Sequence, residues 1–281
     1  MRFIHSIISV LVYSNLFIAG CAVVMANQTY HFLLHTYTNQ HLLFFVLFST
    51  ICSYSFHWYL TADSVILSSR ITWLQQNRHL HLIFFFIGIV GTAIFFFYLI
   101  HYWSWLAMAA VVTFLYSAPK IPHKYFRALR KVALGKTIFL AFVWMYATTV
   151  LPIIISPVKW QSHFILFILS RFFLIYAICI LFDYRDREDD KAAGIRSLIT
   201  YLNEKSILSL FIFSLIVFAV STLLMLQYDY ELLAVLLIFL PGIIVALIYR
   251  YAIKNFSDIF YYLVLDGLMA LSSIIMLVAG I

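Results

Sequence analysis

The chain has 281 residues, of which 65% are hydrophobic and only 10% are charged, and its formal net charge is +7. Soluble domains carry about 25% charged residues, so this composition excludes a soluble globular protein and indicates a polytopic membrane protein. The basic residues are distributed as membrane topology requires, and we therefore expect no nucleic-acid partner.

Apolar runs long enough to cross a hydrocarbon core of about 30 Å as a helix occur nine times along the chain. We expect an all-α fold, with one transmembrane domain over residues 1–281 and nine helices that span the membrane. The predicted spans are 4–26, 39–62, 80–100, 103–119, 132–155, 161–183, 205–227, 231–251 and 257–281.

The first span has an alternative interpretation. Arg2 and His5 precede an apolar stretch that ends in IAGC at 18–21, which resembles a bacterial lipoprotein signal. Cleavage before Cys21 would remove a membrane helix. Because the apolar run continues through Val24 and Met25 and eight further spans follow, we expect a retained helix instead.

The placement of Lys and Arg predicts the orientation. With a cytoplasmic N-terminus, fifteen of the eighteen basic residues lie inside, Lys159 lies outside, and Lys136 and Arg171 lie within spans. The substantial hydrophilic loops at 63–79, 119–131 and 184–204 then face the cytoplasm. We expect an integral protein of the bacterial inner (cytoplasmic) membrane with its active side in the cytoplasm.

Three charged residues lie within the predicted spans: Lys136, Arg171 and Asp266. Each costs roughly 2.5 to 3.5 kcal/mol if it lies centrally, so each needs a partner or a wet cavity. Lys136 lies about one turn inside its span and is expected to snorkel. Arg171 and Asp266 lie at similar depths, and we hypothesise that they pair or share one polar pocket.

The loop at 119–131, PKIPHKYFRALRK, carries five basic residues and no acid. One interpretation is a topology signal that also attracts anionic lipid headgroups, at about 1 kcal/mol per basic residue. The other is a cationic clamp for a diphosphate, whose oxygens accept charge-assisted hydrogen bonds. The two interpretations are compatible.

The segment from Leu181 to Leu198, LFDYRDREDDKAAGIRSL, concentrates five of the eleven acidic residues of the chain. On a continuous helix, Asp183, Asp186 and Asp190 would lie within a sector of roughly 60°. Three carboxylates on one face suit a Mg²⁺ site that serves substrate phosphates. The alternative is a solvated helix end whose acids pair with neighbouring basic residues.

Two sequence stretches resemble the UbiA superfamily of intramembrane prenyltransferases. DREDDKAAGIRS at 186–197 is similar to the second aspartate-rich motif of that family, DxxxDxxxG followed by a basic residue and Ser or Thr. FLYSAPKIPHKYFRALRKVALGK at 114–136 is similar to its Tyr-Pro-x-x-Lys-Arg loop and to the Leu-Gly opening of its fifth helix. The resemblance is sharp over about forty residues.

The resemblance implies that a polyprenyl diphosphate binds through Mg²⁺ ions held by two facing motifs, and that its prenyl group is joined to a membrane-associated acceptor. Carried over to matching positions, Asp186 and Asp190 are the implied catalytic residues and Mg²⁺ ligands, and Asp183 is a supporting ligand. The implied diphosphate contacts are Lys120, Arg187 and Arg196.

The first aspartate-rich motif is where the chain departs from the family. The family pattern is NDxxDxxxD, and the corresponding stretch here is SFHWYLTAD at 55–63, so only Asp63 remains as an implied metal ligand. His57 is a poor substitute because Mg²⁺ prefers oxygen ligands. The loop that follows supplies Arg70 as a further candidate for diphosphate binding.

Two functions therefore remain open from the sequence. The first is a Mg²⁺-dependent UbiA-like prenyltransferase, which the intact second motif favours. The second is a non-catalytic member with a lipid-binding or assembly role in the membrane, which the degenerate first motif favours.

Overall fold

The computed structural model describes residues 2–61, 68–117, 135–192 and 197–280, and within these ranges the chain is helical and contains no strand. The elements are α1 (Arg2–Tyr13), α2 (Leu16–Gln28), η1 (Thr29–Leu33), α3 (Gln40–Thr61), α4 (Ser69–Gln76), α5 (Arg78–Tyr98), η2 (Ile100–Tyr102), α6 (Trp103–Ser117), α8 (Lys136–Met145), η5 (Tyr146–Val150), α9 (Leu151–Ile155), α10 (Phe164–Arg185), α11 (Arg187–Ala192), α12 (Leu198–Tyr201), α13 (Glu204–Leu224), η6 (Met225–Tyr228), α14 (Leu232–Ala252), η7 (Phe260–Leu265) and α15 (Asp266–Ala279).

Eight helices in the described ranges are long and apolar enough to cross a membrane. A further apolar helix, Ile100–Leu115, is shorter and corresponds to the predicted span at 103–119. The all-α, polytopic membrane class is thus confirmed. The count of nine spans and the cytoplasmic N-terminus stay predictions.

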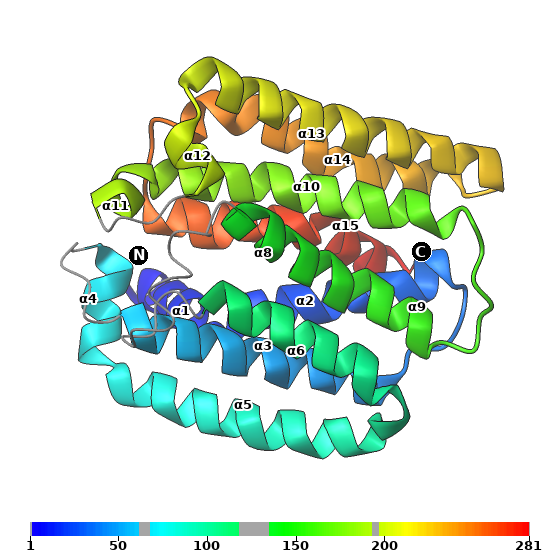
Figure 1. The fold of residues 1–281 in the computed structure, drawn as a ribbon, viewed down its shortest axis with the longest axis horizontal. Helices are drawn as coiled ribbons and strands as arrows, with labels where there is room; N and C mark the ends of the chain where they lie inside the picture. The colour runs from blue at the N-terminus through cyan, green and yellow to red at the C-terminus, as the bar shows by residue number, and fades with distance from the viewer. Residues whose placement is uncertain (1, 62–67, 118–134, 193–196, 281) are drawn as a thin grey trace.

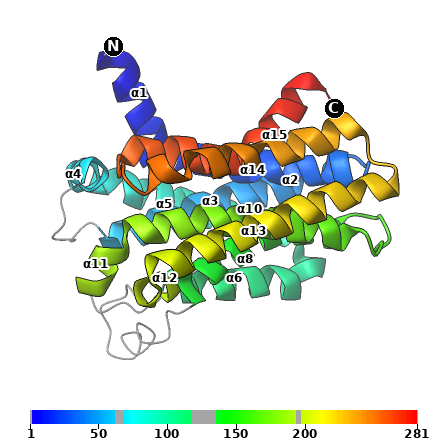
Figure 2. The same ribbon diagram turned by 90° about the horizontal axis from the view of Figure 1, so that it is seen from above.

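The first predicted span differs from the structure in its bounds. The helix is interrupted at Asn15, which adopts a left-handed backbone conformation with φ 68°, and the membrane-length helix runs over Leu16–Leu33 instead of 4–26. Asn tolerates this conformation better than most residues, and its side chain accepts a hydrogen bond from Arg70 Nη2 at 2.7 Å. Helix α1 consequently leaves the bundle at an angle (Figure 2).

The long helices lie side by side in a bundle (Figure 1). Helix α3 packs between α2 and α5, α10 packs between α8 and α13, and α15 packs against α2 and α14. The approach of α3 to α5 requires a small residue, because a Cβ atom on Gly88 would lie 2.7 Å from the backbone nitrogen of Cys52. Small residues permit such close contacts between membrane helices.

Arg171 lies in α10 beside two widened helical turns, η1 and η5. Its Nη1 donates to the carbonyl oxygens of Met25, at 2.7 Å, and Thr148, at 3.2 Å, and its Nη2 donates to Gln28. A π-helical turn disturbs the regular ladder of helical hydrogen bonds, and here the guanidinium binds one backbone oxygen in η5 and one in the last turn of α2, just before η1. The predicted pairing of Arg171 with Asp266 is wrong.

Candidate active site

A cavity of about 420 Å³ lies inside the bundle, bordered mainly by α3, α6, α8, α10 and η7 with α15. One end of the cavity, which we call the charged end, is lined by Lys136, Asp183, Arg185 and Asp186. These residues lie where α8 begins and α10 ends, on the side of the bundle that carries α4 and α11 (Figure 1). The rest of the lining is mostly apolar or carries hydroxyl groups, apart from the carboxylate of Asp266 and the imidazole of His57.

The acidic segment is not one continuous helix. Helix α10 ends at Arg185, Asp186 is the residue that caps it, and α11 begins at Arg187. Asp183 and Asp190 are buried at 5% and 7% exposure, whereas the side chain of Asp186 is 36% exposed. The structure therefore separates the three carboxylates, which the sequence predicts on one face, into the buried pair of Asp183 and Asp190 and the more exposed Asp186. Asp183 and Asp186 line the cavity.

Lys136 bridges the buried pair. Its Nζ lies 3.4 Å from Asp183 Oδ1 and 3.0 Å from Asp190 Oδ2. The hydroxyl of the next residue, Thr137, donates to Asp183. Burial raises the pKa of Asp190 above its ordinary value, and the ammonium of Lys136 opposes that shift. Lys136 thus makes ion pairs inside the protein, in place of the snorkelling that its sequence position predicts.

Asp186 is held by its neighbour Arg185, whose Nε lies 2.8 Å from Asp186 Oδ1. Arg185 is itself anchored by η7, whose tyrosines pack against α10. Its Nη2 donates to the hydroxyl of Tyr262 at 2.7 Å, and its guanidinium lies 4.6 Å from the ring centroid of Tyr261. The position of Asp186 at the cavity therefore depends on η7.

Arg70 does not line the cavity, although the sequence makes it a candidate for diphosphate binding. It is 3% exposed, and its guanidinium lies between the rings of Trp58 and Tyr262, at 3.8 and 4.1 Å from their centroids. Its backbone N–H donates to Asp258 at 2.8 Å. Arg70 thus supports two aromatic residues that do line the cavity.

Arg187 also lies away from the cavity lining. Its Nη1 contacts Glu204 at 2.7 Å, and its Nη2 donates to the carbonyl of Leu202 at 2.9 Å, so it joins α11 to the start of α13. Three other predicted site residues, Asp63, Lys120 and Arg196, fall outside the described ranges.

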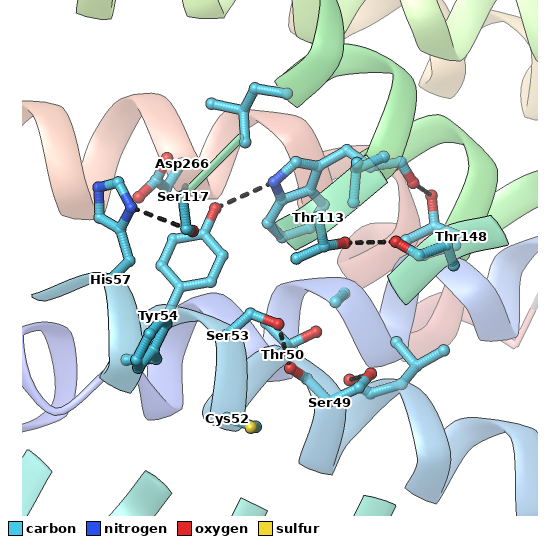
Figure 3. A pocket seen from close by; sticks show the side chains of 18 of the residues that line it. Ser49, Thr50, Cys52, Ser53, Tyr54, His57, Thr113, Ser117, Thr148 and Asp266 are labelled. Carbon is cyan, nitrogen blue, oxygen red and sulfur yellow. Dashed lines mark hydrogen bonds between the residues drawn. The ribbon is translucent and has the colours of Figure 1, made fainter. Parts of the chain in front are cut away.

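The opposite wall of the cavity, formed by α3 and α6, carries neutral polar groups where it is described. His57 Nδ1 lies 3.4 Å from the hydroxyl of Ser117, and Tyr54 accepts a hydrogen bond from the indole nitrogen of Trp144 at 3.0 Å (Figure 3). Ser55, the first position of the degenerate motif, is fully buried and contacts Asn15 instead of the cavity.

Asp266 lies at the cavity, beside the two walls (Figure 3). The positive charges that act on it belong to Arg70 and Arg185. The sequence identified Asp266 as a costly membrane residue but assigned it the wrong partner. Tyr262, which links both arginines, went unrecognised because one tyrosine among nineteen carries no distinguishing signal.

The described residues suit a resident metal only in part. Mg²⁺ requires near-octahedral oxygen coordination at 2.0–2.1 Å, usually with one or two carboxylates. Asp183 and Asp190 converge on Lys136, and no group of three or more His, Cys, Asp or Glu side chains in the described ranges is arranged to hold a metal ion. Asp186 is the described carboxylate of this segment that is both exposed and at the cavity.

The chain was compared with models of known protein families and with curated proteins. The model of the UbiA prenyltransferase family matches residues 60–274. The matched stretch contains the whole charged end of the cavity, whereas most of α3 precedes it. No curated protein matches the chain.

Proposed function

The chain belongs to the UbiA prenyltransferase family, and on that premise we propose that it transfers a prenyl group from a polyprenyl diphosphate to a membrane-associated acceptor. The observation that carries the proposal is the cavity, which has charged residues at one end and an apolar interior within the bundle. An amphiphile with a diphosphate head and a hydrocarbon tail matches both parts.

The interior of the cavity suits a hydrocarbon tail despite its hydroxyl groups. The hydroxyls of Ser53, Thr113 and Thr148 donate to carbonyl oxygens one turn earlier in their own helices, at 2.6, 2.7 and 2.6 Å. These three donors therefore require no polar ligand, whereas the hydroxyl of Thr92, which also lines the cavity, is buried without a hydrogen-bond partner among the described residues. An apolar, water-poor cavity also protects a reactive carbocation from hydrolysis.

The charged end suits the diphosphate. Lys136 and Arg185 line the cavity, and ammonium and guanidinium groups bind phosphate oxygens by charge-assisted hydrogen bonds. Asp186 would hold a Mg²⁺ ion that arrives with the diphosphate, with water and phosphate oxygens as its other ligands. Bound there, the ion would neutralise charge that develops on the leaving diphosphate. Lys120 and Arg196 are proposed as further diphosphate contacts.

In the proposed reaction, the allylic C–O bond breaks and the diphosphate leaves with the bonding electrons. The allylic cation then accepts an electron pair from the acceptor, which loses a proton as the new bond forms. Aromatic faces attract cations, and Phe182, Trp58 and Tyr262 line the cavity near its charged end. Arg70 and Arg187 act by positioning, through Tyr262 and α11 respectively.

We also propose that the charged end faces the cytoplasm of a bacterial inner membrane. The ends of the described helices on that side carry Arg78, Arg185, Lys205 and Arg250, whereas Lys159 lies in the connection at the other end. This distribution satisfies the positive-inside rule. Reporter fusions at the N-terminus and after Ile281 would test it, since nine spans require the two ends to lie on opposite sides.

The function is tested by the release of diphosphate from labelled prenyl diphosphates of several chain lengths, with purified protein in detergent, Mg²⁺ and a membrane lipid extract as acceptor source. We expect Asp186→Asn to reduce release about 100-fold or more, as loss of an electrostatic group at the reacting centre does. Asp189→Asn is the matched control, because Asp189 is exposed and does not line the cavity.

A non-catalytic, lipid-binding role is the second candidate, and the pairing of Asp183 and Asp190 with Lys136 favours it. Tight binding of prenyl diphosphates without release at any chain length would support this role and contradict the enzyme.

A further inference from the structure

One ammonium group lies between two buried carboxylates at the charged end of the cavity. The side chains of Lys136, Asp183 and Asp190 are 18%, 7% and 9% exposed. Lys136 is the first residue of α8, and the adjacent Thr137 fixes Asp183 through its hydroxyl. The carboxylates come from two elements, α10 and α11, so the ammonium joins three helices at one point.

The position of Lys136 Nζ is the position that a cation shared by the two carboxylates must take. A Mg²⁺ ion bound by both would lie at about 2.0–2.1 Å from their oxygens, in the space that the ammonium fills. Two cations within a few ångströms of each other repel strongly at a site with little water. The ammonium and a metal ion therefore exclude one another.

We propose that Lys136 is a built-in cation that replaces one metal ion of the site, so that Asp183 and Asp190 bind no Mg²⁺. The side chain of Lys136 also lines the cavity, so the same ammonium faces the diphosphate. The charged end then needs at most one metal ion, at Asp186. This last step rests on the proposed function, whereas the occupation of the carboxylate pair by Lys136 does not.

The charges of the described residues agree with this inference. Asp183 and Asp190 share Lys136, and Asp186 is paired with Arg185. Each of these three carboxylates therefore contacts a cation supplied by the protein itself.

The test counts metal ions with Mn²⁺ alone, in the absence of any diphosphate, by the electron paramagnetic resonance signal of unbound Mn²⁺. We expect Lys136→Met to bind one more Mn²⁺ per chain than the wild type, because the carboxylate pair becomes available. Lys191→Met is the matched control, since Lys191 pairs with the exposed Glu188, and it should bind as many ions as the wild type. Equal numbers for Lys136→Met and the wild type would overturn the inference.

Two measurements keep the inference testable if Lys136→Met does not fold. Asp190→Asn in the wild-type background should leave the Mn²⁺ count unchanged, and a loss of one ion would contradict us. The thermal midpoint of the wild type should move by less than about 1 °C when EDTA or millimolar Mg²⁺ is added, because ligand-linked stabilisation requires binding. A large Mg²⁺-dependent increase in that midpoint that Asp190→Asn abolishes would also contradict us.

These outcomes are distinguishable from failure of the proposed function. The metal counts and thermal midpoints use no prenyl diphosphate, so they stand whether or not the protein releases diphosphate. Conversely, an active enzyme whose wild type binds a metal at Asp190 would retain the proposed function and lose this inference.

Discussion

The two walls of the cavity use different chemistry to hold their polar groups. On the wall formed by α8, α10 and α11, carboxylates are matched by cations at 2.8 to 3.4 Å. On the wall formed by α3 and α6, His57 Nδ1 lies 3.4 Å from the Ser117 hydroxyl, and Tyr54 accepts a neutral hydrogen bond at 3.0 Å from Trp144 of α8, on the facing wall. Removing one charge from a buried ion pair costs more free energy than removing one neutral hydrogen bond. Mutations at the ion pairs should therefore lower the stability of the protein more than mutations at the neutral contacts.

Asp183→Asn should give the largest effect on stability among changes to either wall. It removes a buried charge that contacts Lys136 and accepts from Thr137, and we expect a loss of about 2 to 3 kcal/mol in the free energy of unfolding. Unfolding by SDS in mixed micelles measures this. Glu188→Gln, at an exposed ion pair, is the control and should leave the unfolding midpoint unchanged; an equal loss in both variants would contradict the buried pair.

His57→Asp places a carboxylate on the neutral wall and so tests whether the two walls face the same ligand. Because carboxylates are the side chains that Mg²⁺ prefers, we expect Mn²⁺ affinity in the presence of inorganic pyrophosphate to rise about 10-fold, equivalent to about 1.4 kcal/mol. Isothermal titration provides the measurement. His101→Asp, an exposed position at the other end of the bundle, should have no such effect. An unchanged affinity in His57→Asp would show that the walls do not face one ligand.

Trp144→Phe should have the smallest effect. It removes the indole donor to Tyr54 while it keeps an aromatic ring, so the expected loss is about 1 kcal/mol in the free energy of unfolding. Diphosphate release should change by no more than about threefold. A loss as large as that of Asp183→Asn would mean that this neutral hydrogen bond between the two walls is as important for stability as the buried ion pairs.

Much of the fold follows from the sequence because hydrophobic length is a local property. The membrane class and the approximate positions of most membrane-length helices were accessible in this way, whereas the family was recognised from two short motifs. The interruption at Asn15 was not, because it depends on Arg70, which lies far along the chain. The bounds of the first helix were therefore wrong even though its presence was predicted.

The acidic residues of the site could be predicted from the sequence, but the cations with which they form ion pairs could not. The motif identified Asp183, Asp186 and Asp190, yet it carries no information about the cation that each one meets. Lys136 was visible as a charged residue in an apolar run, but its role requires knowing that α8 begins beside the end of α10. Arg70 likewise looks like a loop cation in the sequence, and its burial between two rings is a tertiary fact.

The hydrogen bonds that the backbone carbonyl of Thr148 accepts bear on the length of the hydrocarbon tail that the cavity can hold. Thr148 lines the cavity, and its backbone oxygen accepts from both Arg171 and Thr29. These bonds join η1, η5 and α10 in the middle of the bundle. The backbone at this part of the cavity wall is thus held by buried hydrogen bonds, whereas the charged end is held by ion pairs between side chains. A change at Arg171 should accordingly alter the longest tail that fits, and leave the charged end as it is.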